Sequence, residues 1–217
     1  MIQLLKTLLL LLFVSVCIGC GGNKTNKNKL EAQSDKEEVS KNMQDKNSEH
    51  KDRENVPIAE PEINIDQILE AALNGNKASV EEALENGFDV NSTDGEMHTA
   101  LMLASYNGHK EIVKLLLDKG ADPNARDRMD RTALMYSSTG AFNETVLLLL
   151  KAGASPNLVD NEEHFTALMF AAAEGQAEVV VTLLEHGADK TLLDIDNESA
   201  YDFALNNGHM EVAQLLK

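Results

Sequence analysis

The string Thr-Ala-Leu-Met occurs three times in the chain, at 99–102, 132–135 and 166–169. The threonines lie 33 and then 34 residues apart, and Ser199 begins a weaker copy 33 residues further on. A period of this length is typical of stacked repeats, because a unit of this size cannot bury its own apolar face and must pack against its neighbours. We therefore expect an array of similar units.

Each unit is expected to be a pair of helices. In the second unit Thr99 precedes a run with apolar residues on one face, as a helix N-cap does. Gly108 ends that run, since glycine tolerates the left-handed geometry of a helix end. A second apolar helix is predicted over 111–118, with Gly120 after it, and an extended turn leads to the next unit. The predicted fold class is all-α.

The second unit resembles the ankyrin repeat, whose motif runs G-x-T-P-L-H-x-A-A-x-x-G-H-x-E-I-V-x-L-L-L-x-x-G-A-D-x-N. The matching residues are Thr99, Leu101, Ala104, Gly108, His109, Glu111, Ile112, Val113, Leu115, Leu116, Leu117, Gly120, Ala121, Asp122 and Asn124. Five units align, beginning at Asp66, Asp94, Asp127, Asp160 and Asp194. The resemblance implies an ankyrin-repeat solenoid of about five helix-turn-helix units with hairpin loops.

Several departures from the motif carry expectations of their own. Ser79 and Glu82 in the first unit and Asp202 in the fifth replace apolar residues of the inner units, so both ends are expected to be caps of a complete array. In the third unit Ala141 replaces the helix-ending glycine and Phe142 replaces the histidine. We predict that this unit is the least stable. The fourth unit has one extra residue in 161–165, so its hairpin is expected to bulge.

The N-terminus has the layout of a secretory signal. Lys6 precedes a short apolar run over 8–19, shorter than the roughly 20 residues of a membrane-spanning helix. Ile18-Gly19-Cys20 resembles the lipobox of bacterial lipoproteins, although Cys17 stands where that family usually has Leu. The resemblance implies a signal peptide over 1–19, cleavage before Cys20 and acylation of Cys20. An ordinary signal peptide is the alternative. Gly21 rather than Asp after the cysteine implies the outer membrane.

Two further segments follow the cysteine. Residues 20–60 are polar and have no aromatic side chain, which predicts a disordered tether, and 61–217 are predicted to be the repeat domain. The tether has a net charge of −1 over 21–60, whereas 61–217 has a net charge of −17. This acidity argues against a nucleic-acid partner, which needs a basic face. It indicates solubility or, as a sharper alternative, attraction to a basic partner.

No pattern in the sequence predicts catalysis or a cofactor. The chain has no nucleophile motif and no zinc-protease motif, so an enzyme is not expected. No two histidines share the spacing of a metal pair on one helix, so we expect no metal site. The aspartates that begin the units are expected to form turns. Calcium binding by this row is the alternative, without the spacing of an EF-hand.

Binding of another protein is the function that remains. The resemblance implies that hairpin tips and exposed inner-helix residues line a concave surface, and that a monomeric scaffold binds a protein partner in the cell envelope. The alternative is a periplasmic accessory protein that stabilises or protects an envelope enzyme. Transferred by position, the candidate binding residues are Glu96, Met97, His98, Tyr106, Asn107, Arg128, Met129, Arg131, Thr139, Glu163, His164, Phe165 and Glu174.

Overall fold

A computed structural model describes residues 64–217 of the chain. The signal peptide, Cys20 and the tether predicted for the first 60 residues lie outside the described residues. The described part contains ten α-helices in five pairs and no strand, which confirms the predicted all-α repeat solenoid. The helices are α2 (Ile65–Leu73), α3 (Lys77–Glu85), α4 (Ala100–Tyr106), α5 (Lys110–Asp118), α6 (Ala133–Ser138), α7 (Asn143–Lys151), α8 (Ala167–Ala173), α9 (Ala177–Glu185), α10 (Ala200–Asn206) and α11 (Met210–Leu216).

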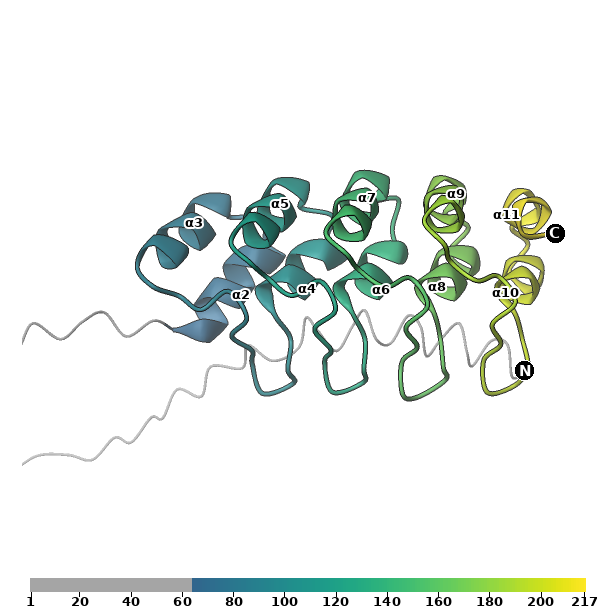
Figure 1. Ribbon diagram of the computed structural model, residues 1–217, viewed down its shortest axis with the longest axis horizontal. Helices are drawn as coiled ribbons and strands as arrows, with labels where there is room; N and C mark the ends of the chain where they lie inside the picture. The colour runs from purple at the N-terminus through teal and green to yellow at the C-terminus, as the bar shows by residue number, and fades with distance from the viewer. Residues whose placement is uncertain (1–63) are drawn as a thin grey trace, which may run out of the picture. The chain divides into compact units, whose positions relative to one another are not determined.

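Within residues 64–217 the helices form two stacked rows (Figure 1). The inner row is α2, α4, α6, α8 and α10, and each of these helices contacts the next. The outer row is α3, α5, α7, α9 and α11, which contact one another in the same order. Four hairpins project from the side of the inner row, away from the outer row. The core lies between the two rows and between successive pairs.

The repeated threonines begin the inner helices, as predicted. Thr99, Thr132 and Thr166 accept hydrogen bonds through Oγ1 from the backbone N–H three residues later, at 3.2, 3.4 and 3.2 Å. Ser199 does the same at 3.4 Å, and the carboxylate of Asp202 accepts from the Ser199 N–H at 2.9 Å. Each cap satisfies a donor that a helix start otherwise leaves unpaired. The opening Thr-Ala-Leu-Met is therefore a cap followed by three buried residues.

A second recurring residue, the asparagine four positions after the glycine that ends the outer helix, joins each of the first three units to the next. Asn124 donates through Nδ2 to the Gly153 carbonyl at 3.0 Å, and its Oδ1 accepts from the Ser155 N–H at 2.8 Å. Asn91 and Asn157 make the same pair of hydrogen bonds to their following units. These bonds tie the ends of neighbouring outer helices together and fix the spacing of the stack.

Rings at the turn inside the second, third and fifth pairs make another link. His109 lies so close to Gly75 that a Cβ at Gly75 would overlap the imidazole ring, and Phe142 covers Gly108 in the same way. His109 Nε2 also lies 2.9 Å from the Leu73 carbonyl, and His209 Nε2 lies 3.0 Å from that of Ala173. Each glycine therefore makes room for a ring of the following unit.

The two irregular units differ from the others locally. In the third unit α6 ends one residue early, at Ser138, with Thr139 as its C-cap. Ala141 is not among the positive-φ residues, unlike the glycines that occupy its position elsewhere. In the fourth unit Asp160 accepts from the N–H groups of Glu163 and Phe165, one residue further along than in the other hairpins. The predicted bulge is confirmed.

None of the described helices is long and apolar enough to span a lipid bilayer.

Candidate functional site

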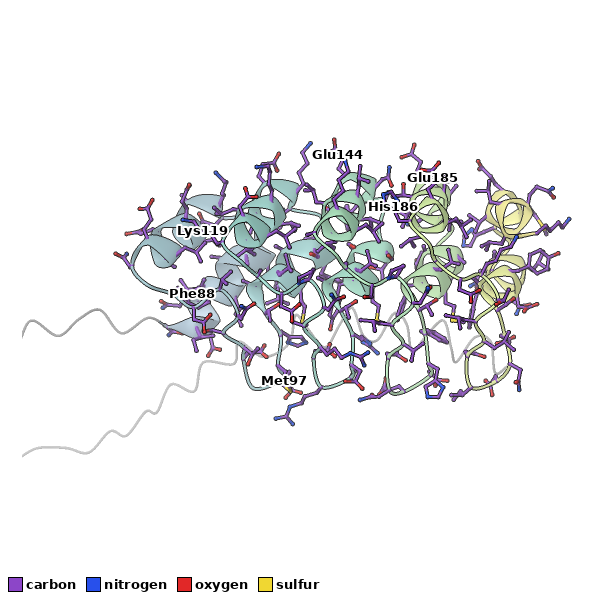
Figure 2. The ribbon with its side chains drawn as sticks, viewed as in Figure 1. Phe88, Met97, Lys119, Glu144, Glu185 and His186 are labelled. Atoms are coloured by element: carbon purple, nitrogen blue, oxygen red, sulfur yellow. The ribbon has the colours of Figure 1, made fainter. Side chains whose placement is uncertain are left out.

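The candidate site is the surface that we call the hairpin face. It consists of the hairpins 94–98, 127–131, 160–165 and 194–198 together with the inner helices α4, α6, α8 and α10. Figure 2 shows Met97 on this side and Lys119, Glu144 and Glu185 on the side of the outer helices. The row of units thus presents two different surfaces.

Each hairpin is held by the aspartate that begins it. Asp94 Oδ1 accepts from the N–H groups of Glu96 and His98, at 2.8 and 2.9 Å. Asp127, Asp160 and Asp194 make the equivalent pairs of bonds in their own hairpins. Because a short polar side chain satisfies two loop donors, the turn is closed without a strand on either side. This is the turn role predicted for the aspartates.

Neighbouring hairpins are joined through their backbones. The Arg128 N–H donates to the Glu96 carbonyl at 3.1 Å, and the Asn161 N–H donates to the Met129 carbonyl at 3.0 Å. The Ile195 N–H donates to the Glu163 carbonyl at 3.2 Å. Arg128 Nε adds a bond to the Gly95 carbonyl at 2.8 Å. The tips therefore form one continuous edge rather than four independent loops.

Two of the predicted binding residues are buried, so their prediction as contact residues was wrong. Phe165 is 5% exposed, and its ring meets those of Phe170 and Phe203 edge-on at 5.5 and 4.9 Å between centroids. Arg131 is 8% exposed and pairs with Asp160 and Glu162 of the next unit, at 3.8 and 3.2 Å. In these two units the residue before the capping threonine contacts the next unit, which covers it.

His98 occupies the same position in the second unit and is mostly buried. Its Nδ1 lies 2.9 Å from Asp94 Oδ2, and its Nε2 lies 3.9 Å from Asp127 Oδ2 of the next unit. Tyr136 donates its hydroxyl to the same Asp127 oxygen at 2.6 Å. His98 therefore links two units at the base of the hairpins, and only 16% of its side chain is exposed.

Tyr136 is a residue of the hairpin face that the sequence reasoning missed. It stands four residues after Thr132, the position that Leu103, Phe170 and Phe203 occupy in the other units. The rings of Tyr106 and Tyr136 meet edge-on at 6.0 Å, and both are partly exposed. The helical period could have found Tyr136, because position four of the inner helix lies on the same side as the hairpin base.

The other predicted residues lie on the surface to different degrees. Glu96, Met97, Asn107, Arg128, His164 and Glu174 are exposed, whereas Tyr106, Met129, Thr139 and Glu163 are partly exposed. Several also serve the fold: Asn107 Nδ2 donates to the Leu73 carbonyl at 2.7 Å, and Arg128 pairs with Glu96 at 3.6 Å. The structure therefore brings most of the predicted residues to one face.

Glu174 stands out electrostatically. Its carboxyl is partly shielded from water by surrounding protein atoms, which raises its pKa above the ordinary glutamate value, while the nearby His209 lowers the pKa by a smaller effect.

Three carboxylates gather at the last hairpin. Ligand oxygens of Asp194, Asp196 and Glu198 lie within 4.8 Å of one another. The turn explains this grouping, since Asp194 Oδ1 accepts the N–H groups of Asp196 and Glu198. The sequence reasoning did not predict the cluster, and we assign it no metal.

These features define a class: a stack of helical hairpins whose neighbours stabilise one another and whose hairpins form one continuous face. A family model described as ankyrin repeats (3 copies) matches residues 68–160 and 140–217, so the chain belongs to the ankyrin repeat family. No curated protein is significantly similar to the chain. Membership marks the domain as a protein–protein interaction module, and proteins of this family are typically scaffolds without enzymatic activity.

Proposed function

We propose that the chain is a lipid-anchored scaffold of the bacterial cell envelope that binds a protein partner through the hairpin face. The observation that carries the binding role is Met97. This large apolar side chain is 48% exposed at a hairpin tip, and its residue adopts a left-handed backbone with φ of 66°. Asp130, His164 and Asn197 hold the left-handed place in the other hairpins, and these types tolerate it well.

Met97 gains little stability in this place. The left-handed conformation costs a residue with a Cβ about 1 kcal/mol, and a side chain that is about half exposed gains only part of its possible burial in return. Strained residues that persist without a structural benefit are found at functional sites. A flexible methionine at a tip is suited to filling an irregular pocket of a partner. Met129, in the neighbouring hairpin, is partly exposed and adds a second methionine to the hairpin face.

The proposal of a lipid anchor is based on the amino-acid sequence. Cys20 follows a short apolar run and a small residue, as the acceptor of a lipoprotein does. Acyl chains contribute about 0.8 kcal/mol per buried methylene, so several chains hold a protein at a membrane durably. With Gly21 after the cysteine, we place the chain at the outer membrane. Radioactive palmitate should label the chain in its host, and Cys20→Ala should remove the label and release the protein from the membrane fraction.

The binding role is tested by Met97→Asn. Asparagine tolerates the left-handed backbone, so the urea midpoint should stay the same or rise. A photo-reactive amino acid at position 129 should cross-link a partner in intact cells, and mass spectrometry identifies it. The matched control places the photo-reactive group at Lys119, on the opposite surface (Figure 2).

Two results would contradict the binding role. One is that position 119 cross-links the same partner as efficiently as position 129. The other is that Met97→Asn leaves the cross-link unchanged.

A further inference from the structure

Exposed apolar side chains of the described residues concentrate in the fifth unit. Leu205 is 36% exposed, Met210 65% and Leu215 40%, and Ile195 of the last hairpin is 50% exposed. Leu193, directly before that hairpin, is 49% exposed. In the first unit only Ile65 reaches a comparable exposure, at 36%. The prediction of polar end faces therefore describes Glu82 and Asp202 but not Leu205 or Met210.

The place of Leu205 in the repeat shows which way it faces. The corresponding residues of the preceding units are fully buried: Ala72, Ser105, Ser138 and Ala172, each at 0% exposure. Ala72 is buried although no described unit precedes it, whereas Leu205, which has the second helix of its own unit but no described unit after it, is 36% exposed. We infer that the following unit covers this position. Leu205 is thus a leucine on a stacking surface that, within the described residues, nothing covers.

Met210 also faces the position of a following unit. The corresponding Lys110 pairs with Glu144 of the next unit, and the corresponding Asn143 accepts from the Thr182 hydroxyl of the next unit at 2.6 Å. Side chains at this position therefore reach forward along the stack. Leu205 and Met210 stand at the ends of α10 and α11 on that side.

Between Leu205 and Met210, the backbone at Gly208 has the geometry that accepts a ring in other units. Gly75, Gly108 and Gly175 are each covered by a ring of the following unit, namely His109, Phe142 and His209. Gly208 has the same left-handed backbone, with φ of +81°, but no atom within 4 Å of the place where a Cβ would stand. The carbonyls of Leu73 and Ala173, two residues before the glycine, lie within hydrogen-bond distance of the histidine rings. In the fifth unit the corresponding carbonyl is that of Asn206.

The charge around this surface is mostly negative. Residues 191–217 contain five acidic side chains and one lysine, Lys217. Asp202 takes the place of the buried methionines Met102, Met135 and Met169 on the stacking surface. Hydrogen bonds from the Ser199 hydroxyl and N–H lower the pKa of Asp202, which keeps it ionised at neutral pH. A complementary surface must therefore carry positive charge beside its apolar residues.

We propose that the exposed end of the fifth unit, formed by Asp202, Leu205, Gly208 and Met210, docks a basic amphipathic helical hairpin of another protein. The hairpin stacks where a further unit would stack. Its apolar stripe covers Leu205 and Met210, a lysine or arginine faces Asp202, and a histidine ring lies on Gly208 and donates to the Asn206 carbonyl. This surface is separate from the hairpin face, so the scaffold can hold two partners.

A second copy of this chain is a poorer occupant. Docking of two identical fifth units would bring Asp202 against a surface of the same negative charge, and residues 64–93 at the other end carry one lysine against six acidic residues. Like charges that meet in a desolvated contact oppose association.

The probe is a synthetic, disulfide-closed helical hairpin with a leucine stripe, lysines on both sides of the stripe and a histidine at the start of its second helix. Two matched probes replace the lysines by glutamates or the histidine by alanine. Fluorescence anisotropy measures binding of each labelled probe to the purified full chain. Leu205→Glu and Met210→Glu are the test variants, and Val181→Glu, a residue of α9 that is 37% exposed, is the control. Thermal melts check that each variant is folded.

We expect the lysine probe to bind, each test variant to weaken its binding at least tenfold, and Val181→Glu to leave it unchanged. The glutamate probe should not bind, and the alanine probe should bind more weakly than the histidine probe. The proposal is overturned if the lysine probe fails to bind, if both charged probes bind equally, or if the test variants bind like the unmodified chain. Sedimentation showing a dimer of the chain that Leu205→Glu dissociates would assign this surface to self-association instead.

Discussion

Replacement of Phe165 by alanine distinguishes a residue of the fold from a residue of the binding face. The ring is 5% exposed and lies between the fourth and fifth units, against Phe170 and Phe203. Truncation of a buried phenylalanine to alanine costs about 3–5 kcal/mol, and this range includes the loss of two edge-on ring contacts. Because the ring lies at the base of a hairpin, water can partly refill the space, and we expect about 3 kcal/mol.

The assay is urea unfolding followed by circular dichroism at the helix minimum. In a thermal melt followed by the same signal, a loss of about 3 kcal/mol should lower the melting temperature of a domain of this size by roughly 6–12 °C. His164→Asn is the matched control, since His164 is the exposed neighbour and asparagine tolerates its left-handed backbone. It should change stability by less than about 0.5 kcal/mol. A loss below about 1 kcal/mol for Phe165→Ala would refute the packed position of the ring.

Three further predictions concern the links between units. Asn124→Ala removes both hydrogen bonds to the next unit and should cost about 1–3 kcal/mol in urea unfolding, and an unchanged midpoint would refute the linking role of the asparagines. Hydrogen exchange should be faster in α6 and α7 than in α4 and α5, because the third unit lacks the left-handed glycine, and stronger protection of the third unit would contradict this. The pKa of Asp202 is lowered in the folded chain, so its contribution to stability is complete above the unfolded value and is lost as pH falls through the lower folded value. The stability gap between the unmodified chain and Asp202→Asn should therefore be widest near neutral pH and shrink below about pH 3.8, whereas a constant gap would show that Asp202 is not linked to folding through its charge.

The period of the sequence was sufficient to predict the paired helices and the threonine caps of the inner helices. Thr99 and Gly108 act locally, through hydrogen bonds and backbone geometry that a few neighbouring residues determine. The extra residue in the fourth hairpin was also visible, because it interrupts the period at a loop. For such features the spacing of residues is enough.

The sequence did not show in which direction individual side chains point. Arg131 and Phe165 are of the types that interfaces favour, and they stand in a hairpin, so sequence reasoning placed them on the surface. Whether a residue before the cap is covered depends on how the next hairpin lies against it, which is a contact between residues about 30 positions apart. Leu205 was missed for the same reason, since only its buried counterparts show that its position faces along the stack.

Both proposed surfaces depend on one claim, that neighbouring units stabilise one another. Deletion of the fourth unit, residues 160–193, tests this claim most directly by equilibrium urea unfolding. If the units are coupled, the shortened chain should unfold at a lower urea concentration, because a whole interface is lost. Its free energy of unfolding should also depend less steeply on urea concentration, because less area is buried. An unchanged urea midpoint would contradict the account.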